Sequence, residues 1–147
     1  MRKGSMLFVL ALITMGFIQE TKDGTLDTGT ITIHIKGIEN KKGQIVFMLF
    51  DQEDGFPKEP DKAFKKGYVK EFTEHASFTF KHVPYGTYAI AVFHDEDSDG
   101  LVKSNFIGMP KESVGASNMT KMGKPSFKKC AIELKDTELK LDMVFII

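Results

Sequence analysis

Short runs of alternating or continuously apolar residues, separated by turn-forming residues, constrain the fold of this chain more than any other feature. Residues 30–38 read TITIHIKGI, so isoleucines point to one side and threonine, histidine and lysine to the other, which is typical of a half-buried strand. Two later runs, residues 44–51 and 88–94, are apolar at nearly every position. We therefore expect both faces of these two strands to be covered.

The spacing of these runs predicts an all-β fold. They lie at residues 30–38, 44–51, 68–72, 76–82, 88–94, 127–134 and 138–145. Regularly spaced short strands with turns between them are typical of sandwiches and barrels. We predict a single all-β domain of about seven strands, a sandwich or a barrel, over residues 30–147. The last two runs are expected to pair with each other in antiparallel fashion, and residues 61–67 to form one short helical turn.

The N-terminus has a different character. Arg2 and Lys3 precede an apolar stretch at residues 6–15, and small and polar residues follow it. This layout is typical of a secretory signal peptide, and the apolar stretch is too short to span a bilayer comfortably. We predict a signal peptide over residues 1–18, a flexible linker over 19–29, and export to the periplasm or cell surface, with no transmembrane segment in the mature chain.

Charge and cysteine content exclude some function classes. The chain has 20 basic and 20 acidic residues, and Arg2 is its only arginine. Arginine is the side chain best suited to bidentate contacts with phosphates and base edges, so a nucleic-acid partner is not expected. Cys130 is the single cysteine, so no intramolecular disulfide can form. A partner in the periplasm or at the cell surface stays open.

The run DEDSDG is the most distinctive chemical feature. Alternate aspartates followed by glycine resemble the first half of an EF-hand calcium loop, because such a turn brings hard oxygen ligands to one point. The metal ligands would be the side chains of Asp95, Asp97 and Asp99 and the backbone carbonyl of Leu101. The position of the bidentate glutamate in that pattern holds Phe106. The run is therefore either a calcium site that Asn105 or Glu112 completes, or a solvated acidic turn.

The segment after this run, residues 101–126, is rich in Met, Gly, Ser and Pro and lacks periodicity. It is too long for a simple connection, and long loops on compact scaffolds often carry function. We expect it to fold over the second apolar face of the 88–94 strand. Its methionines could line an adaptable apolar surface or simply pack in the core. In and around this segment, the candidate ligand-binding residues are His94, Asn105, Glu112, Ser117 and Asn118.

The evidence for catalysis is slight. His94 with Asp95 or Glu112 could form a proton-transfer pair of a hydrolase. However, the sequence contains no nucleophile motif, no zinc-ligand spacing and no glycine-rich loop for phosphate or a dinucleotide. Calcium is the one cofactor that the residues suggest.

Several stretches, in this order, resemble the bacterial family known as domain of unknown function 2141. They are Gly43-Gln44-Ile45, Leu49-Phe50-Asp51, Gly55-Phe56-Pro57, the stretch from Pro84 to Asp95, the stretch from Phe106 to Glu112, Gly115-Ala116-Ser117-Asn118 and Pro125-Ser126-Phe127. The resemblance covers about residues 30–146. It implies an exported bacterial protein with an immunoglobulin-like or transthyretin-like β-sandwich, and it implies no particular activity.

Three hypotheses about function follow. The leading one is a non-enzymatic binding or structural module of the periplasm or cell surface, with a calcium-stabilised acidic loop. The alternatives are a periplasmic, hydrolase-like enzyme that uses His94 and neighbouring carboxylates, and a carrier of a small apolar ligand.

Overall fold

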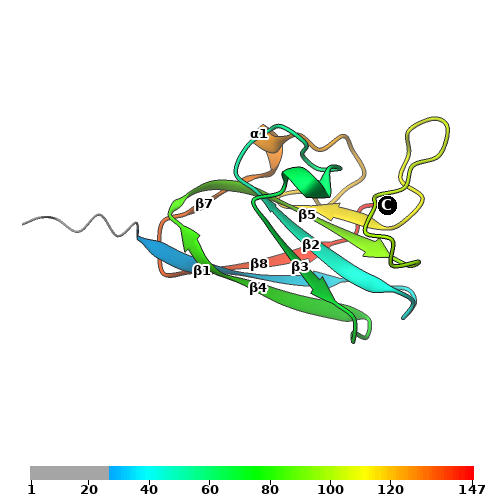
Figure 1. The fold of residues 1–147 in the computed structure, drawn as a ribbon, viewed down its shortest axis with the longest axis horizontal. Coiled ribbons are helices and arrows are strands. Elements are labelled where there is room, and N and C mark those ends of the chain that lie inside the picture. Colours follow the sequence, from blue (N-terminus) through cyan, green and yellow to red (C-terminus); the bar gives the residue numbers. More distant parts are fainter. Residues whose placement is uncertain (1–26) are drawn as a thin grey trace, which may run out of the picture.

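The structure, a computed structural model, describes residues 27–147 and consists of two β-sheets packed face to face (Figure 1). One sheet has the strand order β4-β1-β8, and the other has the order β3-β2-β5-β6, with β7 also paired to β5. The strands are β1 (Thr28–Lys36), β2 (Gln44–Phe50), β3 (Lys65–Val69), β4 (His75–Pro84), β5 (Gly86–Asp95), β6 (Val114–Ala116), β7 (Ala131–Leu134) and β8 (Glu138–Val144). The predicted all-β sandwich is confirmed, with eight strands instead of about seven.

The predicted signal peptide and most of the predicted linker lie outside the described residues. Strand β1 begins at Thr28, inside the segment predicted as linker. Within residues 27–147, no helix is long and apolar enough to cross a membrane.

The main hydrophobic core lies between the two sheets. The three alternating isoleucines of β1, Ile31, Ile33 and Ile35, are fully buried there, as the period of two predicts. From the opposite sheet Phe47 packs into the same core, and its ring stacks on that of Phe78 with centroids 5.6 Å apart. Burial of this apolar surface is the main term that stabilises the sandwich.

Strands β2 and β5 are buried on both faces, as predicted from their continuous apolar runs. Their antiparallel register sets Val46 opposite Phe93 and Met48 opposite Ala91 on the outer face of the five-stranded sheet, the face turned away from the second sheet. This outer face is covered by the short helix α1 (Phe127–Cys130), the 3-10 helix η1 (Pro60–Lys62) and irregular segments (Figure 1). The expectation that residues 101–126 fold over this face is confirmed, since Val102 packs against it.

Residues 127–134 were expected to form one strand, and this expectation is wrong. The first half forms helix α1, because the Ser126 side chain accepts a hydrogen bond from the Lys129 N–H and so caps the helix. The helix directs Phe127 onto the outer face, where its ring meets the edge of Phe56 at 6.2 Å. Cys130 at the helix end is buried as a free thiol, and burial raises its pKa.

The expected antiparallel pairing of the last two strands is also wrong. Strand β7 pairs with β5, whereas β8 lies in the other sheet and runs parallel to β1. Residues 135–137 carry the chain from one sheet to the other, and the Thr30 N–H bonds the Thr137 carbonyl at 2.9 Å. A Cβ on Gly29 would lie 2.6 Å from the Asp136 carbonyl oxygen, so only glycine permits this close approach.

Strand β3 begins three residues earlier than the predicted 68–72 run, and the helical turn is limited to η1. Gly67, the last residue of the predicted turn, lies within β3. A Cβ there would come within 2.2 Å of the Phe78 ring, so the glycine gives that ring room in the core.

Candidate functional site

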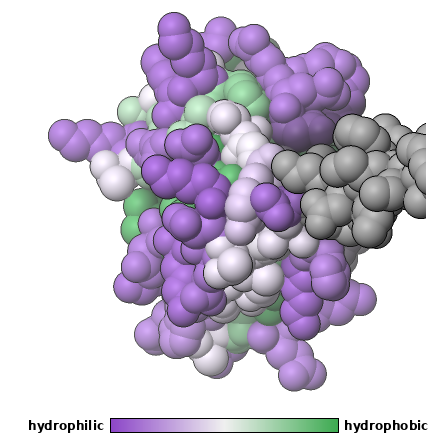
Figure 2. Space-filling view, turned by 90° about the vertical axis from the view of Figure 1, so that its left-hand side faces the viewer, coloured by the Kyte–Doolittle hydropathy of each residue, from purple (hydrophilic) through white to green (hydrophobic). Residues whose placement is uncertain are grey.

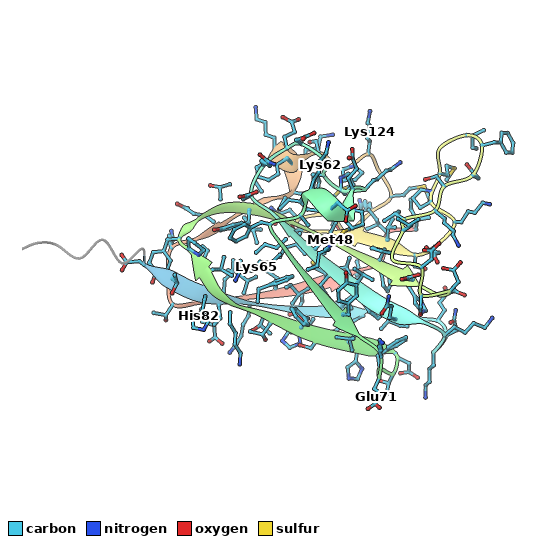
Figure 3. The ribbon with its side chains drawn as sticks, viewed as in Figure 1. Met48, Lys62, Lys65, Glu71, His82 and Lys124 are labelled. Carbon is cyan, nitrogen blue, oxygen red and sulfur yellow. The ribbon has the colours of Figure 1, made fainter. Side chains whose placement is uncertain are left out.

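The outer face of the five-stranded sheet is only partly covered, and a cleft of about 600 Å³ remains on it. Its floor is formed by Met48 from β2 and by Ala91 and Phe93 from β5. In Figure 3, Lys124 lies above Met48 on the side of the sheet away from β1, β4 and β8. The walls are formed by residues 55–59, Val102, 108–110, 114–116, 122–125 and 146–147.

The cleft is bordered by a loop, residues 104–110, that is held as a tight turn. Asn105 organises it, because its side-chain oxygen accepts hydrogen bonds from the N–H groups of Ile107 (3.1 Å) and Met109 (3.0 Å). Met109 lines the cleft, whereas Phe106 at the tip is 99% exposed. Asn105 was expected as a ligand-binding residue; in the structure its side-chain oxygen helps to shape the wall of the cleft.

The two ends of the sandwich differ in surface character. Figure 2 shows the end at which β1 starts, where hydrophilic residues cover most of the face and hydrophobic ones appear only in small recesses. The 104–110 loop projects at the opposite end (Figure 1), and it carries the exposed side chains of Phe106 and Ile107. The 104–110 loop thus carries two of the most exposed large apolar side chains among the described residues.

The acidic loop follows β5 directly and closes the same outer face. Asp95 is fully buried, and its carboxylate accepts hydrogen bonds from Gln44 Nε2 (2.8 Å) and from the backbone N–H groups of Asp99 (3.1 Å) and Gly100 (2.8 Å). Because a buried carboxylate needs such donors, they fix the shape of the turn. Asp95 therefore stabilises the turn whether or not a metal binds.

The three predicted metal-binding carboxylates do come together. Oxygen atoms of Asp95, Asp97 and Asp99 lie within 4.8 Å of one another. The Lys103 ammonium bridges Asp97 and Asp99, with 2.9 Å to Asp99 Oδ2, and this lysine lowers the pKa of Asp97. Leu101 donates its backbone N–H to Asp99 Oδ1 (2.9 Å) and exposes its side chain.

Glu112 reaches this loop from the middle of the 101–126 segment. Its Oε1 accepts a hydrogen bond from the Glu96 N–H (3.1 Å), and its Oε2 is a buried side-chain oxygen without a hydrogen-bond partner among the described residues. Burial, together with the charges of Asp95, Asp97 and Asp99, raises the pKa of Glu112. Of the two residues suggested to complete a calcium site, Glu112 is thus at the loop and Asn105 is not.

His94 and Asp95 are neighbours in the chain but point to opposite faces of β5, because side chains alternate along a strand. The His94 ring faces the interior, where it meets Phe72 edge-on and its Nε2 bonds the Lys42 carbonyl oxygen at 2.7 Å. Within residues 27–147, no hydrogen bond joins His94 to Asp95 or Glu112. The proton-transfer pair considered from the sequence is therefore not formed.

Ser117 and Asn118 hold strands together. Strands β6 and β7 share one edge of β5, and Ser117 lies between them. Its hydroxyl accepts from the Ile90 N–H (2.9 Å) and donates to the Cys130 carbonyl, so it replaces a backbone partner that β5 lacks at this point. Asn118 Nδ2 donates to the Ala131 carbonyl oxygen (2.7 Å).

Sequence similarity identifies the family of this chain. Residues 33–142 match the family described as "Uncharacterized protein conserved in bacteria (DUF2141)", and the chain belongs to this family. No curated protein matches the sequence. Among solved structures, one from Pseudomonas aeruginosa, described as a "putative carbohydrate binding protein", is similar at 13% identity and a TM-score of 0.37. The match covers 81% of this chain and 89% of that one.

Sequence reasoning missed the residues of the cleft floor. The continuous apolar character of β2 and β5 predicts that their outer-face residues are covered. It does not predict that this cover is incomplete. Lys103, which neutralises the acidic loop, lies in no recognisable motif, and Gln44, which anchors this loop, was noted only as part of the family resemblance.

Proposed function

We propose that this chain is a non-enzymatic binding module and that its ligand is a small molecule with an apolar body, bound in the cleft of the outer sheet face. The observation that carries this proposal is the cleft of about 600 Å³ with its apolar floor of Met48, Ala91 and Phe93. Ligand pockets in proteins typically measure about 300 to 1,000 Å³ and are lined mainly by apolar side chains with a few polar groups.

Two features of the cleft favour ligand binding over simple packing. Two of its wall residues are methionines, Met109 and Met122, whose flexible side chains adapt to different ligand shapes. Both are well exposed at present, at 40% and 67%, so a ligand would remove apolar surface from water.

The test uses N-phenyl-1-naphthylamine, a neutral apolar probe whose fluorescence rises in an apolar site. We expect saturable binding to the wild-type protein, and we expect Ala91→Leu to abolish it because leucine fills the cleft floor. Thr87→Leu is the matched control, since it adds the same side chain to an exposed position of β5 that does not line the cleft. Absence of binding, or equal binding to all three proteins, would refute the proposal.

Native mass spectrometry provides an independent test. Protein purified without detergent is expected to carry a co-purified small molecule in the wild type and in Thr87→Leu, and to lack it in Ala91→Leu.

We further propose that the domain acts after export, in the periplasm or at the cell surface. Support comes from the basic and apolar character of residues 1–18. N-terminal sequencing of protein recovered from the periplasmic or surface fraction should find the leader removed, whereas an intact Met1 in the cytosolic fraction would contradict export.

A second proposal concerns the acidic loop: calcium binds there and stabilises the domain. It is supported by the convergence of Asp95, Asp97 and Asp99 and by the unpartnered Oε2 of Glu112. Six to eight oxygen ligands satisfy calcium, and carboxylates are favoured among them. The Lys103 ammonium lies between two of these carboxylates, so it would have to be displaced.

Thermal unfolding, first in a chelator and then with added calcium, tests this proposal. An ion that binds only the native state raises the midpoint temperature of unfolding. We expect a rise with calcium, a larger rise in Lys103→Gln at the same calcium concentration, and none in Asp97→Asn/Asp99→Asn. If neither the wild type nor Lys103→Gln responds to millimolar calcium, the loop is a turn neutralised by its own lysine.

A further inference from the structure

We infer that the ligand of the cleft is an anionic amphiphile, a molecule with an apolar body and one negatively charged head group such as a carboxylate, sulfonate or phosphate. This inference rests on the proposed function and specifies its ligand class. It comes from the charged side chains at the rim of an otherwise apolar cleft. Three such side chains line it: Lys58, Glu59 and Lys124.

The single acidic side chain is already neutralised. Glu59 Oε2 forms an ion pair with Lys62 Nζ at 3.1 Å, and this lysine is not one of the cleft-lining residues. Lys62 Nζ also forms an ion pair with Asp54 Oδ1 at 3.0 Å, so Lys62 neutralises both Asp54 and Glu59 beside the cleft.

The two cleft lysines, in contrast, have no carboxylate partner. Within residues 27–147, neither Lys58 nor Lys124 forms a salt bridge with an acidic side chain. Lys58 Nζ makes only a long hydrogen bond, 3.4 Å, to the Gly108 carbonyl oxygen of the 104–110 loop. That contact holds one ammonium group at the rim, between the two loops that wall the cleft.

Charge and shape therefore specify complementary parts of one ligand. The floor of Met48, Ala91 and Phe93 contributes no hydrogen-bonding side chain. The apolar surface that a ligand would remove from water belongs mainly to the wall residues Met109 and Met122. The ammonium groups at the rim can donate to an anionic head group without arginine's bidentate geometry. Because both lysines are exposed, their contribution to affinity is moderate and depends on salt.

A matched pair of probes tests this inference. 1-Anilinonaphthalene-8-sulfonate and N-phenyl-1-naphthylamine share the same aromatic body, and only the first carries a negative charge. We expect the sulfonate to bind wild-type protein about three- to tenfold more tightly at low salt, with the preference shrinking as salt rises. In Lys58→Gln/Lys124→Gln we expect the preference for the sulfonate to be lost, so that the two probes bind equally.

The control variant is Lys81→Gln/Lys135→Gln, which removes the same net charge from exposed positions outside the cleft. It should retain the preference for the sulfonate. Equal binding of both probes to the wild type, or loss of the preference in the control variant as well, would overturn the inference while the apolar cleft stands. If the neutral probe fails to bind, or binds regardless of Ala91→Leu, the proposed function itself fails.

Discussion

The two faces of the five-stranded sheet are both apolar, but they are covered in different ways. The inner face packs against a second sheet, whose isoleucines Ile31, Ile33 and Ile35 are fully buried. The outer face packs against helix α1, η1 and irregular segments, and these leave the cleft of about 600 Å³. The same strand composition thus produces a closed core on one side and an open site on the other.

The difference has a physical cause. Two pleated sheets present side chains at matching spacings, so they interdigitate to the packing density of a crystal. An irregular segment must also satisfy its own backbone hydrogen bonds, as Asn105 does for the 104–110 loop, and this restricts how closely it follows the sheet. Space that the loops do not fill then becomes available to a ligand.

The largest effect is expected from the inner face. Phe47→Ala removes a fully buried ring that stacks on Phe78, and it should destabilise the domain by about 3–5 kcal/mol, because the closed core collapses only partly around the void. Urea unfolding measures this loss. A loss below about 1 kcal/mol would mean that the inner face is packed no more tightly than the outer one.

Asp95→Asn tests the polar end of the outer face. The substitution removes the carboxylate that accepts hydrogen bonds from the Gln44 side-chain amide and from the backbone N–H groups of Asp99 and Gly100. We expect the free energy of unfolding to fall by about 2–3 kcal/mol, as measured by urea unfolding in a chelator. Asp97→Asn is the control: its carboxylate is exposed, and we expect no measurable change. Equal losses in the two variants would contradict a structural role specific to Asp95.

The outer face itself contains a filled part and an open part. Substitutions at two alanines of β5 allow the two parts to be compared. Ala89 packs with Ala116 and Cys130, so Ala89→Leu overpacks the site and should cost about 1–3 kcal/mol. Ala91 lines the cleft, so Ala91→Leu should cost less than about 1 kcal/mol by urea unfolding. If Ala91→Leu is the more destabilising, the cleft is not an open space in solution.

The smallest expected effect is a pH dependence of the stability of the domain, which arises from Glu112. Its folded-state pKa is raised above the ordinary value of 4.5, chiefly by burial, so the native protein holds this proton more tightly than the unfolded chain does. The resulting stabilisation is fully present below pH 4.5 and is lost as pH rises through the folded-state pKa. Relative to Glu112→Gln, the wild type should lose stability over that interval in a chelator, and a constant difference between the two would be contrary evidence.

Much of the fold could be predicted from local pattern, and the candidate site only in part. The alternation in β1 and the continuous apolar runs of β2 and β5 were sufficient for the sandwich and for a cover on the outer face. The opposite orientation of His94 and Asp95 also follows from strand alternation alone. The roles of Ser117 and Lys103 do not, because each depends on partners that are brought together only by packing.

What the sequence by itself determined is the position of strands β1, β2, β4, β5 and β8, the side of each strand to which its residues point, and the convergence of acidic groups in one turn. These are local properties, set by the period of two along a strand and by short-range turn chemistry. Tertiary structure alone decided that β8 pairs in parallel with β1, that Lys103 bridges the acidic loop and that the outer face keeps a cleft. Pairing partners and residual volume depend on how distant segments pack together, and no local pattern encodes that.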